Sequence, residues 1–179
     1  YFNGNLASTQ TTNILNTASS LFQLGNVQGY FDDLKIYDDA LTATQVQQLN
    51  SHNNLIQPTS LVDHYTFDNT LMGTSGHILA NVTGNYVNDR NGNLNSAHNV
   101  SNTSTNIGIP NLPIGNDSRT LAFWYQSNAQ STHSLFNYGP SSNYFGVVYV
   151  SSPSSILVGS GNSADYSTPI TYTGNWTHV

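Results

Sequence analysis

The sequence predicts an all-β protein, an antiparallel two-sheet β-sandwich (jelly roll) with one short helix. Short apolar stretches alternate along the chain with Gly, Asn, Ser and Pro, a pattern typical of strands joined by turns. Aromatic residues make up 11% of the 179 residues, enough to build a core and too many for a disordered chain. Helical periodicity is confined to one segment that follows Thr42.

Ten stretches have the composition of strands. They are Tyr1–Phe2, Leu21–Leu24, Gly29–Tyr37, Asp63–Phe67, Asn106–Ile109, Arg119–Ser127, Ser134–Tyr138, Tyr144–Val150, Ile156–Gly159 and Trp176–Val179.

Two of these strands allow a finer prediction. The run from Thr120 to Tyr125 is apolar on both faces, as expected of a central strand covered by a second sheet. In the strand Gly29–Tyr37, simple alternation assigns the residues to two faces. One face would carry Phe31, Asp33, Lys35 and Tyr37, and the other Asp32, Leu34 and Ile36.

The helix is predicted from its first turn. Thr42 can act as the N-cap, and Gln45 three residues later would complete a capping box. Val46 and Leu49 then form an apolar edge. Such an edge usually packs on the domain core, so we expect a helical turn that closes the sandwich.

Charge excludes several classes of partner. Only 7% of the residues are charged, against about 25% in a typical soluble domain. The net charge is −6, and the bases are Lys35, Arg90 and Arg119. A nucleic-acid partner needs clustered cations, and so does an anionic membrane surface. We expect neither, and no apolar run is long enough for membrane insertion.

The chain contains several segments with a recognisable pattern. The run GYFDDLKIYDDALTATQVQQL, Gly29–Leu49, is the most specific and is similar to the closing signature of laminin-G-like jelly-roll domains of the concanavalin A-like lectin and glucanase class. LVDHYTFDNTL (Leu61–Leu71) resembles their opening strand, and RTLAFWYQS (Arg119–Ser127) a central strand. NWTHV (Asn175–Val179) resembles the strand that precedes a hairpin of the YFNGNL type, which here stands at Tyr1–Leu6.

These signatures occur in permuted order, which suggests a domain organisation. Residues 1–50 resemble the C-terminal part of one module, and residues 61–179 the N-terminal part of the next. The polar segment 51–60, which carries Pro58, is expected to be a linker. The two parts would then each complete a sandwich with a neighbouring repeat or subunit. The alternative is one domain with a permuted chain order.

The resemblance implies a non-catalytic extracellular module that binds a glycan or a surface protein within a large, repetitive cell-surface protein. The absence of cysteine favours a bacterial source. Two alternatives remain open. One is a purely structural stalk or fibre repeat, which needs no cluster of exposed aromatic rings. The other is an accessory carbohydrate-binding domain of a secreted glycan-active enzyme. Tyr138, Tyr144, Tyr149, Tyr166 and Tyr172 are candidates for stacking on sugars, but none is singled out as a ligand-binding residue.

The resemblance also implies a calcium site. The matching positions are Asp68 on the opening strand and the pair Asp32 and Asp33 on the closing strand. Carboxylates and turn carbonyls are the ligands that Ca²⁺ prefers. The family pattern has a further Asp before a Ser-Gly, where this chain has Gly73-Thr74-Ser75-Gly76. The competing interpretation is that these carboxylates accept hydrogen bonds from backbone amides.

Catalysis is not expected. Glucanase relatives use paired glutamates, and this chain contains no glutamate. The neighbouring pairs Asp32–Asp33 and Asp38–Asp39 would point to opposite faces of a strand and so could not flank one glycosidic bond. The six histidines lack the spacing of metal ligands and are expected at the surface or at strand edges.

Overall fold

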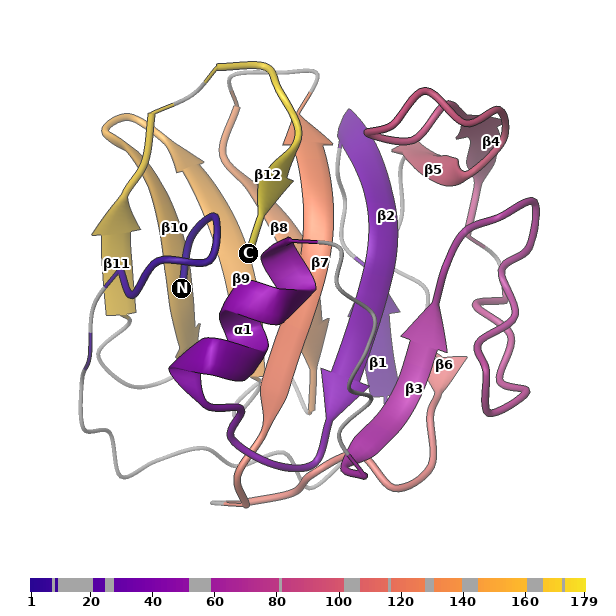
Figure 1. Ribbon diagram of the computed structural model, residues 1–179, viewed down its shortest axis with the longest axis horizontal. Helices are drawn as coiled ribbons and strands as arrows, with labels where there is room; N and C mark the ends of the chain where they lie inside the picture. The colour runs from indigo at the N-terminus through magenta and orange to yellow at the C-terminus, as the bar shows by residue number, and fades with distance from the viewer. Residues whose placement is uncertain are drawn as a thin grey trace.

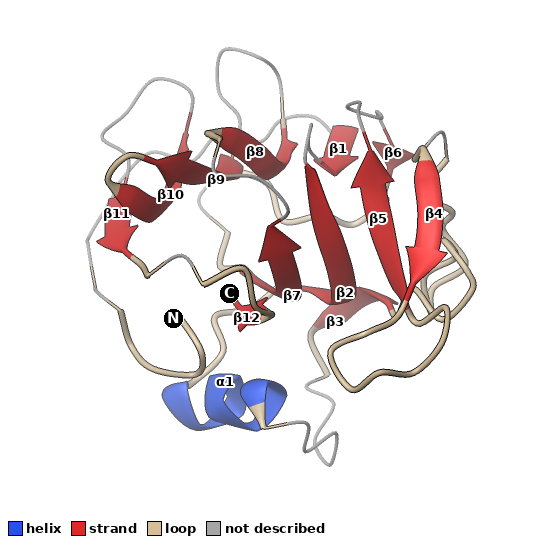
Figure 2. Ribbon diagram, turned by 90° about the horizontal axis from the view of Figure 1, so that it is seen from above, coloured by secondary structure: helices blue, strands red, loops and turns tan. Residues whose placement is uncertain are grey.

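The computed structural model describes residues 1–7, 9, 21–24, 28–51, 59–80, 82–101, 107–115, 117–127, 131–139, 145–160, 166–171 and 173–179. These residues form two antiparallel sheets that pack face to face, with one helix outside them, so the predicted fold class is confirmed (Figures 1 and 2). No helix in the described part of the chain has the length and hydropathy to cross a membrane.

Sheet I consists of six strands. In spatial order they are β11 (Tyr166–Pro169), β10 (Ser154–Ser160), β9 (Phe145–Ser151), β8 (His133–Tyr138), β1 (Leu21–Leu24) and β6 (Ile107–Gly108).

Sheet II is built around the longest strand, β2 (Gln28–Tyr37). Its spatial order is β12 (Thr177–His178), β7 (Thr120–Ser127), β2, β5 (Ala97–Ser101) and β4 (Gly84–Val87), with β3 (Leu61–Tyr65) also paired to β2. On the side away from β7, the first part of β2 pairs with β5 and its last part pairs with β3.

The helix α1 (Ala43–Asn50) lies on the outer side of sheet II, away from sheet I (Figure 2). The predicted capping box is present: Gln45 N donates to Thr42 Oγ1 over 3.4 Å, and Thr42 N donates to Gln45 Oε1 over 2.8 Å. Val46 is buried, as expected for a helix that packs on the sandwich.

Aromatic rings fill the core between the sheets. Phe31 of β2 packs 5.7 Å from Phe123 and 5.2 Å from Tyr125 of β7, measured between ring centroids. Phe123 makes an edge-to-face contact with Phe136 of sheet I at 6.1 Å. Each such pair stabilises a fold by about 0.5–1.5 kcal/mol beyond its burial, so the rings tie β2 to β7 within sheet II and β7 to the opposite sheet.

Residues 1–50 and 61–179 share this one sandwich. The expectation that they pack in separate sandwiches is therefore wrong within this chain, because β2 uses both of its edges to pair with β3, β5 and β7. In sheet I, β1 likewise pairs with β6 and β8. This is the packing of the permuted alternative. Most of the expected linker 51–60 lies outside the described residues, and modules in a longer chain remain a prediction.

The N-terminal hairpin and β12 lie next to each other (Figure 1). Asn3 N donates to the carbonyl of His178 over 2.8 Å, and His178 N donates to Asn3 Oδ1 over 2.9 Å. Asn3 and Gly4 have φ of 47° and 74°, as the Asn-Gly turn predicted. The YFNGN hairpin therefore does lie beside the NWTHV strand.

Candidate functional site

A β-bulge in β2 decides which side chains reach the outer face of sheet II. The β2–β7 register shifts between Asp32 and Lys35, and Asp33 has φ of 51°. One extra residue in a strand reverses the alternation beyond it. Phe31, Leu34 and Ile36 consequently face the core.

The predicted division of the β2 side chains between two faces is therefore wrong. Asp32 and Asp33 lie on the outer side, together with Lys35. The left-handed conformation of Asp33, which a short polar side chain tolerates, is the local cause.

Asp32 and Asp33 converge on Arg90, which lies in the β4–β5 loop. Arg90 Nη1 donates to Asp32 Oδ2, and Arg90 Nη2 donates to Asp33 Oδ2 over 2.6 Å. Asp33 Oδ1 also lies 2.8 Å from His64 Nε2. The expectation that these two aspartates point apart is wrong, because the bulge turns both toward one guanidinium.

The pKa values of the two carboxyls are shifted in opposite directions, because their partners differ. Burial raises the pKa of Asp32 to about 7, against the attraction of Arg90. Burial also opposes ionisation of Asp33, but hydrogen bonds from His64 and Arg90 and the charge of Lys35 hold its pKa well below the usual range. The guanidinium thus faces one carboxyl whose pKa is lowered and one whose pKa is raised.

Arg90 also packs on an aromatic ring. Its guanidinium carbon lies 4.8 Å from the ring centroid of Trp124, and the ring of His178 lies 5.1 Å from that of Trp124. The Arg90 side chain is only 10% exposed. A planar cation stacked on a ring and held by two carboxylates is rigidly placed, so the β4–β5 loop is fixed to the outer face of sheet II.

The three residues predicted to bind calcium are not arranged as one cation site. Asp32 and Asp33 are engaged by Arg90, so a cation would have to displace the guanidinium. Asp68 is exposed, and its backbone N–H donates to Thr66 Oγ1 over 3.3 Å. Within the described residues, no group of three or more histidines and acidic residues could hold a metal ion. The present arrangement does not fit the ion, and calcium binding remains a prediction.

Asp63 organises the turn where the family pattern would place another acid. It is fully buried and accepts hydrogen bonds from Ser75 N over 3.1 Å and from His64 N over 2.8 Å. A Cβ on Gly73 would lie 2.3 Å from Asp63 Oδ1, so residue 73 has no room for a side chain. The glycine is therefore required by the packing of Asp63.

A serine, a histidine and an aspartate also meet at this turn, but without the geometry of a catalytic triad. Ser75 Oγ lies 2.7 Å from His77 Nδ1, and Asp63 Oδ2 lies 3.1 Å from the same nitrogen. A triad histidine contacts its serine through Nε2 and its aspartate through Nδ1. Here both partners share one nitrogen, so the histidine is not placed to pass a proton between them.

Near the start of β2, the outer face of sheet II carries a row of neutral side chains that were not predicted from the sequence. Asn85 of β4 pairs with Asn99 of β5, Asn99 with Tyr30 of β2, and Tyr30 with Gln126 of β7. Trp176 lies beside this row, its ring 6.3 Å from that of Tyr30. We call these five residues the outer row. All five are partly or well exposed.

The pairing register explains why the outer row is on the outside. Three members alternate with core residues: Tyr30 precedes Phe31, Asn99 precedes Val100, and Gln126 follows Tyr125. Three hydrogen bonds steady its amides. Asn99 Nδ2 donates to Asn85 Oδ1 over 3.3 Å, Asn85 Nδ2 donates to the Tyr86 carbonyl over 3.3 Å, and Gln126 Nε2 donates to the Gly174 carbonyl over 2.6 Å. Since β4 and β5 were not predicted, the sequence could not reveal this alignment.

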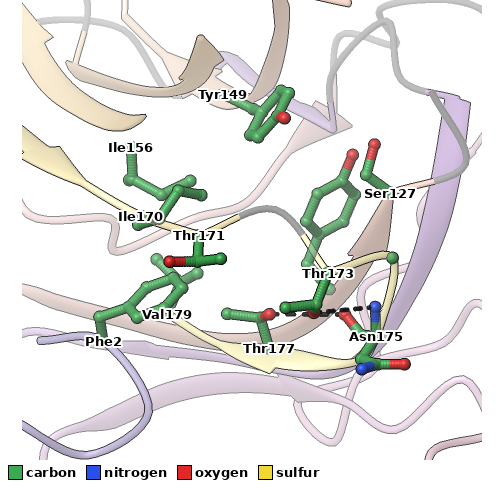
Figure 3. Close-up of a pocket in the computed structure, with 12 residues that line it drawn as sticks. Phe2, Ser127, Tyr149, Ile156, Ile170, Thr171, Thr173, Asn175, Thr177 and Val179 are labelled. Atoms are coloured by element: carbon green, nitrogen blue, oxygen red, sulfur yellow. Dashed lines mark hydrogen bonds between the residues drawn. The ribbon is translucent and has the colours of Figure 1, made fainter. Parts of the chain in front are cut away.

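The structure also contains two cavities at the β12 side of the sandwich. The first, shown in Figure 3, lies between Tyr149, Ser127, Ile170 and Thr177 and has a volume of about 20 Å³. A volume of this size holds roughly one water molecule, so it is too small for a sugar ring. Figure 3 also shows the bonds from Asn175 N to Thr173 Oγ1 and from Thr177 Oγ1 to the Asn175 carbonyl.

The second cavity, of about 220 Å³, lies at the edge of β7 and has a largely apolar lining that includes Leu121, Phe123, Val147 and Val158. Its lining also has polar side chains, those of Tyr1, Arg119, Thr120, Thr168 and His178.

Several histidines and tyrosines lie elsewhere than expected. His98, His133 and His178 are buried, so a place at the surface is wrong for all three, although His178 does lie on β12 at the edge of sheet II. Burial lowers the pKa of all three. Tyr138 and Tyr149, which were candidates for sugar stacking, belong to the core. Tyr144 and Tyr172, two further candidates, lie outside the described residues.

No family model, no curated protein and no solved structure matches this chain.

Proposed function

We propose that this chain is a non-catalytic, laminin-G-like binding or adhesion module of an extracellular surface protein. Its ligand, a glycan or a protein, would bind on the outer row of sheet II. The observation that carries the proposal is the row itself: Tyr30 and Trp176 stand beside the amides of Asn85, Asn99 and Gln126 on one accessible face. Aromatic faces with a few fixed polar groups are typical of ligand sites.

The charged groups of sheet II favour a non-catalytic role. A glycosidase needs one free acid and one free base or nucleophile on either side of the bond to be cleaved. Asp32 and Asp33 instead share Arg90 and are shielded by it, with Asp32 only 5% exposed. A cluster of this kind is suited to fixing a loop.

The location and the neighbours are proposed from composition and resemblance. A surface made soluble by about 25 asparagines, with serine and threonine, suits a secreted protein of the bacterial cell surface. Neighbouring repeats or subunits would be its structural partners, in addition to the ligand. Calcium would be a cofactor only if it displaced Arg90 from Asp32 and Asp33.

The two alternatives differ from this proposal at the same face. A stalk repeat has no need of accessible rings, so replacing Trp176 would change nothing but local packing. An accessory domain of a glycan-active enzyme would use the outer row as we propose, but beside a catalytic domain. The exposed outer row favours a binding role over a stalk.

A bead-binding assay tests the proposal. Beads coated with the 179-residue chain are mixed with immobilised yeast mannan, barley β-glucan, fibronectin and collagen. The proposal predicts retention on at least one of them, lost in Trp176→Ala and kept in Tyr1→Ala, which removes an exposed ring outside the outer row. Failure to bind any of them, or equal retention of both variants, would count against the outer row as the ligand face.

A further inference from the structure

The outer row runs straight across sheet II. Its register places Asn85, Asn99, Tyr30 and Gln126 side by side on four neighbouring strands. Trp176 precedes His178 by two residues, and His178 pairs with Trp124, so Trp176 continues the row from the residue just before β12. Neighbouring strands are about 4.8 Å apart, so the four strands and the segment before β12 extend the row over roughly 19 Å. The row is therefore long enough to contact several units of a linear polymer.

The row offers neutral hydrogen-bonding groups and ring faces. Asparagine and glutamine side chains each present an acceptor oxygen and two donor hydrogens, which match hydroxyl groups in either role. Tyr30 and Trp176 present partly exposed rings, 6.3 Å apart and inclined by 42°. Hydroxyl groups lie around the edge of a sugar ring and C–H groups on its faces, so amides beside aromatic rings can contact both.

The charges around the row disfavour an anionic ligand. None of the five residues is charged, and Arg90 in the adjoining part of the face is held by Asp32 and Asp33. The chain has a net charge of −6, which repels a polyanion over longer distances.

A protein ligand is also disfavoured. The centre of a protein interface is normally apolar, with charged and polar groups at its rim. In the outer row, Gln126 lies between the two aromatic residues, and Asn99 and Asn85 follow Tyr30 on the next two strands, so the other three positions are all amides. A flat strip of amides suits a hydroxylated ligand better.

We infer that the outer row binds a neutral, linear polysaccharide that lies across the strands of sheet II, with Tyr30 and Trp176 stacking on its sugar rings. This inference rests on the proposed function and narrows its ligand to one class. The polymer would contact Trp176 just before β12, and then β7, β2, β5 and β4 in turn. The 20 Å³ cavity and the apolar 220 Å³ cavity would take no part.

Affinity electrophoresis of the whole chain tests this inference. Native gels contain barley β-glucan, xyloglucan, galactomannan or yeast mannan as neutral polymers, and hyaluronan or heparin as anionic ones. At least one neutral polymer should retard the chain, while the anionic ones should not. Trp176→Ala and Tyr30→Ala should each weaken binding by about tenfold or more, as for the central aromatic residues of other binding sites. Gln126→Ala should weaken it less, and Tyr1→Ala should leave it unchanged.

A second readout uses salt. Binding to the neutral polymer, followed by calorimetry, should keep its affinity when NaCl rises from about 0.1 M to about 1 M, although the Debye length falls from about 10 Å to about 3 Å. Thermal unfolding of each variant shows whether it is folded, and Tyr30→Phe gives a milder change at the same position.

The outcomes separate the two levels of the account. Retardation by hyaluronan or heparin that is lost in Trp176→Ala overturns the neutral class but keeps the outer row as a ligand face. Retention on fibronectin or collagen that is lost in Trp176→Ala likewise overturns the neutral polysaccharide as ligand but keeps the outer row as a ligand face. Absence of retardation by every polymer, or equal retardation of wild type and variants, overturns the inference.

Discussion

Arg90 lies over the ring of Trp124, with its guanidinium carbon 4.8 Å from the ring centroid, while its two terminal nitrogens donate to Asp32 and Asp33. Arg90 lies 58 positions from Asp32 and 57 from Asp33 in the chain, and these contacts join the three residues at one point of sheet II. The β4–β5 loop supplies the arginine and the bulge in β2 supplies the acids. The loop and the sheet consequently depend on each other for stability.

Arg90→Ala should destabilise the chain strongly. Removing the guanidinium leaves two buried carboxyl groups without their cation, which costs about 3–5 kcal/mol at other buried ion pairs. Urea unfolding followed by fluorescence measures the change. Because Asp32 and Arg90 are in contact, Asp32→Asn introduced into Arg90→Ala should recover part of the loss. A loss below about 1 kcal/mol would mean that the pair is solvated like an ordinary surface salt bridge.

Acidification should affect His178 and Asp32 in opposite directions. Burial first, and then the charges of Lys35 and Arg90, lower the pKa of His178 to about 4. Its contribution to stability is therefore complete above its ordinary pKa of 6.5 and is lost as the pH falls toward 4, by up to roughly 3 kcal/mol. The raised pKa of Asp32, about 7, gives stability that is present below pH 3.8 and lost as the pH rises through 7.

Two variants measure these contributions. Urea unfolding between pH 7 and pH 4 should show a smaller loss of stability on acidification in His178→Gln than in wild type. Asp32→Asn should show a larger loss. Parallel pH profiles for all three proteins would mean that neither side chain titrates with a shifted pKa.

The response to calcium should show whether Arg90 takes the place of a bound cation beside Asp32 and Asp33. We expect calcium to raise the unfolding midpoint of Arg90→Ala more than that of wild type, because only the variant leaves Asp32 and Asp33 open to a cation. An ion that binds only the folded form stabilises it by about 2.7 kcal/mol at a hundredfold excess over its Kd. Thermal unfolding with calcium or chelator measures this. If chelator lowered the wild-type midpoint and Asp68→Asn abolished the effect, the predicted site at Asp32, Asp33 and Asp68 would be upheld.

Gly73→Ala should destabilise the turn around Asp63. The added Cβ would lie 2.3 Å from a carboxylate oxygen that is fixed by hydrogen bonds from Ser75 and His64, so the turn must shift. Overpacking of this kind typically costs about 1–3 kcal/mol. Gly76→Ala is the control for a methyl group in the same turn, since its Cβ would meet no atom within 4 Å and only its φ of 86° opposes it. Equal unfolding midpoints for Gly73→Ala and wild type would show that Asp63 can move.

Local patterns in the sequence were sufficient for much of the fold. The strand Leu21–Leu24 and the capping box of Thr42 and Gln45 were predicted as they occur, because each depends on neighbouring residues. The strands β4 and β5 were missed because Gly84-Asn85-Tyr86-Val87 and Ala97-His98-Asn99 carry too many polar residues to be distinguished from loops. Their place in sheet II comes from pairing with each other and with β2.

The site was less predictable for two physical reasons. A left-handed residue such as Asp33 has no clear sequence signal, and the bulge it creates reversed the faces of Leu34 and Ile36. The outer row and the Arg90 cluster join residues from strands far apart in the chain, so they depend on register. The polar row at Asn85 and Asn99 could be recognised only after β4 and β5 were known.

The central claim is that the outer row is the ligand face, and NMR titration tests it most directly. A ¹⁵N-labelled chain is titrated with the oligosaccharide of whichever neutral polymer retards it best in the gels. The account predicts that the indole N–H of Trp176 and the amides of Tyr30, Asn99 and Gln126 shift together, while the indole of Trp124, covered by Arg90, shifts little. Shifts confined to the residues around the 220 Å³ cavity, such as Leu121 and Val147, or no shifts at all, would contradict it.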